Sequence, residues 1–164
     1  MSDAMPYTVR LVGPADRAEW LRMRRLLWPD GADEHGAEID AFIAAADPAL
    51  ATFILARPDG RLGGFLEAGS RPYAEGCAGP AGYIEGWWVD EDLRRRGHGR
   101  RLVAAAEAWA REQGFTEMAS DALIDNRVSH LAHGALGYQE VERIVCFRKP
   151  LTAGEGGAEP MPRG

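Results

Sequence analysis

The stretch Ile84–Val89 (IEGWWV), followed by Arg94–Gly99 (RRRGHG), organises the rest of this 164-residue chain. Its first half is apolar, aromatic and β-branched with one carboxylate, Glu85, which predicts a buried strand. The second half is a basic, glycine-punctuated turn that opens into Arg100–Gln113, where apolar residues recur at helical spacing. A helix N-terminus presents unpartnered N–H groups and the positive end of its dipole, and glycines let the backbone approach a ligand closely. The stretch therefore predicts an anion site built from a strand, a turn and a helix.

The spacing Arg94-x-x-Gly97-x-Gly99 differs from the two common nucleotide loops. It lacks the third glycine of the dinucleotide fingerprint and the Gly-Lys-Ser/Thr of the P-loop. On spacing alone, a loop with three arginines can also be merely solvated. The motif therefore indicates a phosphate-bearing ligand only in combination with the strand and helix around it.

The composition excludes several classes of protein. A net charge of −6 at pH 7 argues against a nucleic-acid partner and is compatible with a cationic substrate. No apolar run reaches the length of about 18 residues that a membrane span needs, and Met1–Tyr7 lacks the features of a secretory signal, so we expect a cytoplasmic protein without membrane contact. Cys77 and Cys146 are expected to be reduced, with Cys146 in the core, and no Cys/His spacing indicates a metal site.

The order of elements predicts an α/β domain over residues 1–151, with a mixed central sheet flanked by helices. Residues 152–164 are rich in Gly, Pro and Glu and are expected to be disordered. A Pro-Asp-Gly turn at 58–60 predicts a hairpin. The expected strands are Thr8–Val12, Ala51–Arg57, Leu62–Ser70, Ile84–Val89, Thr116–Ser120 and Val141–Phe147, and the expected helices are Arg17–Trp28, Glu34–Ala46, Arg100–Gln113 and Arg127–Leu136.

These motifs resemble those of the Gcn5-related N-acetyltransferases. The Arg-x-x-Gly-x-Gly loop after a central strand is one match, and Asn126-x-x-Ser129 with Leu136–Tyr138 is another. Over Tyr7–Leu151 the chain is most similar to aminoglycoside 6′-N-acetyltransferases, and Met118–Asp121 is among the more specific segments. The resemblance implies acetyl-CoA as donor, an aminoglycoside as acceptor and a homodimer.

The resemblance also implies which residues form the two binding sites. The donor residues it implies are Trp87, Trp88, Val89, Arg95, Arg96, Gly97, His98, Gly99, Arg100 and Asn126. The acceptor residues it implies are Trp28, Tyr73, Glu85, Asp121 and Glu142.

Acetylation of an amine needs a proton acceptor, because most such amines are protonated at neutral pH. Glu85 is our candidate base, directly or through water, and Asp121 is expected to grip the acceptor and share the role. A main-chain N–H near Trp87 or Val89 is expected to polarise the thioester carbonyl. A proton for the thiolate can come from His133, from Tyr138 or from neither.

We expect direct transfer in a ternary complex. A polyamine, a protein N-terminus or a lysine remains an alternative acceptor, and a CoA-binding module without turnover is a further alternative.

Overall fold

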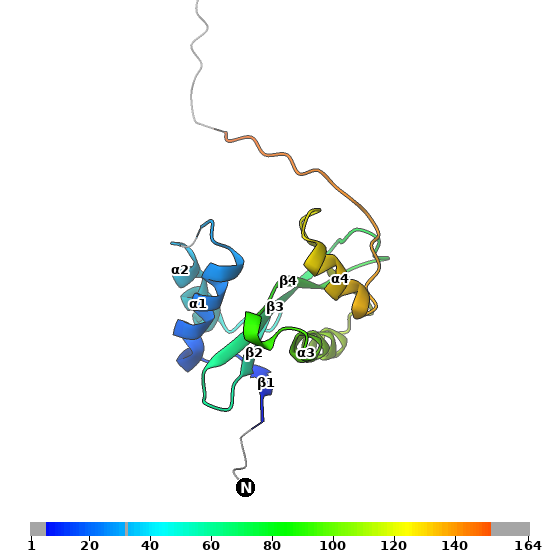
Figure 1. Cartoon of the computed structure of the whole chain (residues 1–164). Coiled ribbons are helices and arrows are strands. Elements are labelled where there is room, and N and C mark those ends of the chain that lie inside the picture. Colours follow the sequence, from blue (N-terminus) through cyan, green and yellow to red (C-terminus); the bar gives the residue numbers. More distant parts are fainter. Residues whose placement is uncertain (1–5, 32, 152–164) are drawn as a thin grey trace, which may run out of the picture.

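The computed structural model describes residues 6–31 and 33–151, which form one mixed sheet with helices on both faces (Figure 1). The strands lie in the order β1-β2-β3-β4-β5; the first four are antiparallel and β5 runs parallel to β4. This confirms the predicted mixed sheet. The strands are β1 (Thr8–Leu11), β2 (Ala51–Ala56), β3 (Leu62–Arg71), β4 (Ala81–Val89) and β5 (Met118–Ser120). The helices are α1 (Arg17–Leu27), α2 (His35–Ala45), α3 (His98–Glu112) and α4 (Arg127–Ala135), with short 3-10 turns η1 (Pro14–Asp16) and η2 (Glu91–Leu93).

The alternation of side chains along β2, β3 and β4 divides the core into two layers. Phe65 and Ile54 face α1 and α2, where they meet Trp20, Met23 and Ile39. The residues on the opposite face of these strands, Leu55, Leu66, Ala68 and Ile84, pack against Leu102, Val103 and Ala106 of α3. Because successive strand residues point to opposite faces, a single-residue shift of register would bury the wrong set, so this pattern fixes the register.

Turns and glycine residues end several strands and helices close to the positions that the sequence predicts. The Pro-Asp-Gly turn closes the β2–β3 hairpin, with Arg57 N–H donating to the Arg61 carbonyl (2.8 Å). Gly60 and Gly114 have positive φ, the conformation that favours glycine at such turns. The positions of α1, α2 and α4 are as expected within two residues at either end, and α3 begins two residues earlier than predicted, at His98.

β4 and β5 pair over only three residues and then separate. The last paired residues are Ile84 and Ser120, so within the described residues the stretch Glu85–Val89 has no neighbouring strand on that side. β4 also carries an irregularity at this point, because Gly86 pairs with Glu67 and Ile84 with Ala68, which leaves Glu85 without an opposite residue. The separation leaves backbone groups of β4 available to a ligand beside α3 and α4.

The predicted final strand, Val141–Phe147, is wrong for this structure. Residues 139–150 have no helical or strand conformation, and Figure 1 shows this segment (orange) running away from the sheet after α4. The segment includes large apolar side chains that are exposed, among them Ile144, Val145 and Phe147. A strand needs a partner, and no described part of this chain supplies one here. Cys146 is consequently exposed rather than in the core, which corrects that expectation as well.

The predicted tail at 152–164 lies outside the described residues, so its disorder stays a prediction. Within the described part of the chain, no helix is both long enough and apolar enough to cross a membrane. Among the same residues, no group of three or more His, Cys, Asp or Glu side chains is arranged to hold a metal ion.

Candidate active site

The basic turn is a preformed anion cradle at the start of α3. Gly97 is the N-cap, with φ of 82°, and Arg95 also has a positive φ of 59°. The first helical hydrogen bond runs from Arg101 N–H to the Gly97 carbonyl (3.2 Å), so the N–H groups of residues 97–100 have no intrahelical partner. Left-handed residues at a helix N-terminus form concavities that bind phosphate. The loop therefore fits a diphosphate.

The arginines of the turn have different partners. Arg94 donates to the Val89 carbonyl (2.8 Å) and lies over the indole of Trp88, and Arg100 donates to the Ala135 carbonyl of α4 (3.0 Å). Arg95 and Arg96 are exposed, and no ion pair of theirs is found among the described residues. Of the three arginines before Gly97, these two are free to meet an anion.

The two other predicted members of the turn have packing roles that sequence reasoning did not anticipate. A Cβ at Gly99 would lie 2.8 Å from the Trp87 ring, so this glycine lets α3 pack directly on the central strand. His98 is buried against Tyr7, with 4.6 Å between ring centroids. Burial lowers the pKa of His98, as do Arg101 and Arg96, so its side chain is a neutral packing group.

The splay between β4 and β5 is lined by Trp87 on one side and by α4 on the other. Trp87 meets His133 edge to face, with 5.6 Å between centroids, and His133 meets Tyr138 in the same way. Nδ1 of His133 lies 2.8 Å from the Ser129 carbonyl and therefore donates to it, which leaves Nε2 to accept from Ser120 Oγ (2.9 Å). Of the two candidate acids, His133 faces the splay, whereas the Tyr138 hydroxyl donates to Glu107 of α3 (3.0 Å).

Asn126 caps α4 by accepting a hydrogen bond from Ser129 N–H (3.1 Å) through its side-chain oxygen. The N–H groups of the same amide can still donate to acetyl-CoA, whose site is predicted to include Asn126.

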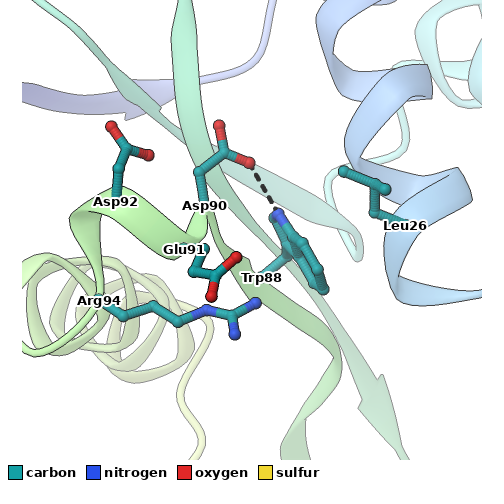
Figure 2. A pocket seen from close by; sticks show the side chains of 6 residues that line it. All are labelled: Leu26, Trp88, Asp90, Glu91, Asp92 and Arg94. Carbon is teal, nitrogen blue, oxygen red and sulfur yellow. Dashed lines mark hydrogen bonds between the residues drawn. The ribbon is translucent and has the colours of Figure 1, made fainter.

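A pocket of about 620 Å³ lies beside the predicted donor residue Trp88 (Figure 2). The indole N–H of Trp88 donates to Asp90 (3.0 Å), as the dashed line shows. Asp90 also forms ion pairs with Arg22 of α1 and with Arg57 of the β2–β3 hairpin, each at 3.0 Å. This network ties α1 and the β2–β3 hairpin to the end of β4 and holds the backbone just before the anion turn. The pocket is lined by Leu26, Trp88, Asp90, Glu91, Asp92 and Arg94.

The two predicted catalytic carboxylates belong to one chain of contacts. Glu85 accepts two hydrogen bonds from Arg71, one from Nη2 at 2.7 Å and one from Nε at 3.2 Å. The central guanidinium carbon of Arg71 lies over the Tyr83 ring, 3.5 Å from its centroid. Tyr83 in turn donates its hydroxyl to Asp121 (3.0 Å). Burial, and then Asp121, raise the pKa of Tyr83, so the phenol keeps its proton and remains a donor.

This chain corrects one expectation and adds two residues. Glu85 is exposed, not buried, because the irregularity in β4 turns it toward Gly69 and Arg71 at the open end of the sheet. Sequence reasoning missed Arg71 and Tyr83. Arg71 is two residues from Gly69 and Tyr83 is two residues from Glu85, and residues two apart share a face in a regular strand. The irregularity in β4 at Glu85 breaks this rule, so the spacing alone could not place the four residues together.

Trp28, another predicted acceptor residue, packs its indole against β4. It occupies the space that a Cβ at Gly86 would need, so Trp28 sits one residue along β4 from Glu85. Arg24 lies over the same indole, 5.2 Å from the centroid, and pairs with Glu38 (2.7 Å) and with Glu67 (3.2 Å). Burial raises the pKa of Glu67, against the opposing effects of Arg24 and of the Trp20 indole N–H, which donates at 2.8 Å.

An acidic pocket of about 320 Å³ adjoins Trp28, between α1 and α2. Arg24 is the one arginine in its lining, and its charge is already engaged by two carboxylates. A surface with this excess of negative charge attracts a cation. The pocket is lined by Arg24, Trp28, Asp30, Gly31, Glu34, His35 and Glu38.

Two other predicted acceptor residues, Tyr73 and Glu142, make none of the contacts described for Glu85, Asp121 and Trp28. Tyr73 is exposed in the loop between β3 and β4. Glu142 lies on the extended segment after α4, where it is also exposed. Their acceptor roles stay predictions.

Comparison with known proteins agrees with this geometry. Residues 18–138 match the family model for the acetyltransferase (GNAT) family. The chain belongs to the GNAT family. Among curated relatives, an aminoglycoside N(6′)-acetyltransferase type 1 from Klebsiella aerogenes is 50% identical over 153 residues, covering 91% of this chain and 99% of the relative. One from Stenotrophomonas maltophilia is 41% identical and covers 88% of this chain and 94% of the relative.

Solved structures give the same result. AAC(6′)-Iy, in complex with the bisubstrate analog CoA-S-monomethyl-acetylneamine, superposes on this GNAT protein with a TM-score of 0.82 at 34% identity, covering 89% of this chain and 99% of the other. AAC(6′)-Ih from Acinetobacter baumannii gives a TM-score of 0.83 at 34% identity, with coverages of 90% and 100%. The resemblance drawn from the sequence is therefore confirmed, as is the predicted fold.

Proposed function

We propose that this GNAT protein transfers the acetyl group of acetyl-CoA to the 6′-amine of aminoglycosides and thereby confers resistance to them. The observation that carries the proposal is the splay of β4 and β5, which opens between an anion cradle and a pair of linked carboxylates. The names of the relatives support the acceptor class, and the CoA adduct of acetylneamine bound to AAC(6′)-Iy supports both substrates together.

In this proposal the donor's diphosphate binds the N-terminus of α3, where residues 97–100 offer free N–H groups and Arg95 and Arg96 add charge. The pantetheine arm follows the unpaired edge of Glu85–Val89, as strand-adding ligands do. A main-chain N–H of that edge, near Trp87 or Val89, stabilises the oxyanion.

The chemical step is direct transfer in a ternary complex. The acceptor amine attacks the thioester carbonyl; an N–C bond forms and the C–S bond breaks. Glu85, directly or through water, takes the amine proton, and Asp121 holds the acceptor with Tyr83. The thiolate takes a proton from His133 only if Nε2 of that ring, which accepts from Ser120 in this structure, is first protonated; otherwise the thiolate leaves without a proton.

A thiol-release assay tests this proposal. Aminoglycosides that carry a 6′-amine, such as kanamycin, should release CoA from acetyl-CoA, and analogues with a 6′-hydroxyl should not. Equal release with both kinds would contradict the regiochemistry. Faster turnover of a polyamine, a lysine peptide or a protein N-terminus in direct competition would favour the alternative acceptors. Binding of CoA without release on any amine would favour a module without turnover.

We also propose a homodimer in which the segment 139–151 pairs with a second copy. Its apolar side chains are exposed, and within the described residues no strand pairs with the outer edge of β5. This pairing would bring Glu142 of one copy close to the acceptor site of the other copy. A chain ending at Tyr138 should elute as a monomer in light-scattering chromatography, whereas the full chain should elute as a dimer. A monomeric full chain would contradict this arrangement.

The cytoplasm remains the proposed compartment. The two cysteines are free, Cys77 partly buried and Cys146 exposed, which suits a reducing environment.

A further inference from the structure

Arg71 makes the two kinds of contact that an acceptor ammonium group needs at this site. Its guanidinium uses both oxygens of Glu85 and covers one face of the Tyr83 ring. A carboxylate and an aromatic face are the usual recognition groups for an organic cation. In this structure a cation of the chain itself therefore occupies these groups.

The occupied state conflicts with the role proposed for Glu85. A general base needs a carboxylate oxygen within hydrogen-bond reach of the amine or of an intervening water. Here Oε1 accepts from Nε and Oε2 accepts from Nη2 of Arg71. An ammonium group brought to the same place would also meet a guanidinium of like charge.

Arg71 is placed so that it can leave. It is the last residue of β3, directly before the loop that joins β3 to β4. Its side chain is 41% exposed and that of Glu85 is 38% exposed, so the pair is held at the surface. Exposed ion pairs of this kind contribute little stability, because water and salt screen them.

We propose that Arg71 is an internal occupant of the acceptor site, which neutralises Glu85 when no acceptor is bound and is displaced by the acceptor's ammonium group. This inference rests on the proposed function. It makes Arg71 a determinant of acceptor affinity, since each acceptor must replace the Arg71–Glu85 pair. An acceptor with a positive charge replaces the Arg71–Glu85 ion pair with an ion pair of its own to Glu85, whereas a neutral amino sugar cannot. Arg71 therefore also favours cationic acceptors over neutral amino sugars.

The proposal predicts tighter binding when Arg71 is removed. Calorimetric titration of kanamycin is made in saturating CoA, which carries no acetyl group and so prevents turnover. Because the lost competitor is an exposed pair, the Kd for kanamycin of Arg71→Gln and of Arg71→Met should fall by about two- to fivefold. The gain should disappear in the Glu85→Gln background, because the group for which Arg71 and the acceptor compete is then absent.

A matched control separates this effect from bulk charge. Arg61→Gln removes one exposed arginine paired with Asp59 in the β2–β3 hairpin, far along β3 from Arg71. It changes the net charge equally and should leave the Kd unchanged. An equal fall in Kd in Arg61→Gln would overturn the proposal.

A Kd that is unchanged or higher in both Arg71 variants, with melting temperatures like that of the wild type, would also overturn it. Such a result would mean that Arg71 stays on Glu85 and holds it in position. Failure of the proposed function is seen separately, since wild-type protein would then neither bind kanamycin nor release thiol with it.

Discussion

Trp28, the C-cap residue of α1, lies directly on Gly86 of β4, with its indole in the space that a side chain at position 86 would need. The contact joins the helix layer to the one strand that carries both predicted substrate sites. Arg24 covers the same indole, and His35 Nε2 lies 2.8 Å from the Trp28 carbonyl. Trp28 is thus held by α1 and the sheet at its indole and by α2 at its main-chain carbonyl.

Gly86→Ala should push Trp28 out of place. Overpacking of a filled contact costs about 1–3 kcal/mol of stability, so the melting temperature should fall. The KM for the acceptor should rise, whereas the KM for acetyl-CoA should stay within about twofold, since the anion turn is untouched. Steady-state kinetics with each substrate varied in turn checks this split. Gly79→Ala is the control, because a Cβ there meets no neighbouring atom, and its kinetics should match the wild type.

Arg24→Gln should leave Glu67 buried without its cation. Removing one partner of a buried ion pair costs about 3–5 kcal/mol, and urea unfolding near neutral pH measures the loss. Arg17→Gln, which breaks the exposed pair with Asp40, should have a much smaller effect.

The loss in Arg24→Gln should also depend on pH. Burial raises the pKa of Glu67, so as pH falls through that value the carboxylate gains a proton and the Arg24–Glu67 attraction is lost in the wild type as well. The difference between wild type and variant should therefore shrink in mildly acidic solution. Glu38 and His35 also face this group, and the double variant with Glu38→Gln shows their share. A difference that grows on acidification would contradict the assignment.

Gly97→Ala should weaken donor binding. A left-handed conformation costs a residue with a Cβ about 1–2 kcal/mol, so the turn should relax and misalign its N–H groups. We expect the KM for acetyl-CoA to rise severalfold with little change in the acceptor KM. Gly134→Ala, inside α4 with open space around it, is the matched control and should preserve both constants. An unchanged acetyl-CoA KM in Gly97→Ala would mean that this turn does not hold the donor.

Asp16→Asn should lower stability in a pH-dependent way. Asp16 accepts from Arg10 at 2.7 and 2.9 Å and from Gly13 N–H at 2.8 Å, and the Arg10 hydrogen bonds hold the pKa of Asp16 below its usual value of 3.8. A carboxylate with a lowered pKa stabilises the fold above its unfolded pKa, and this stability is lost as pH falls through the folded pKa. The variant should therefore lose about 2 kcal/mol at neutral pH and progressively less below pH 4, measured by urea unfolding. A loss that is constant with pH would contradict the charge-based explanation.

The sequence by itself determined the parts of this protein that depend on near neighbours along the chain. Helical spacing in α1 and α3, the Pro-Asp-Gly hairpin and the glycine-punctuated turn before α3 follow from local sterics and from periodic burial, so they could be predicted. Glu85 and Asp121 could be singled out as candidate acceptor carboxylates, a role that stays a proposal, but their surroundings could not be predicted. Glu85 meets Arg71 at a separation of 14 residues and Tyr83 meets Asp121 at 38.

Only the tertiary structure decided those partnerships, because strand register and the irregularity in β4 set which side chains share a face. It also decided the fate of Val141–Phe147, whose pattern is that of a strand. Strand conformation requires a hydrogen-bonding neighbour, and within the described part of the chain this segment has none.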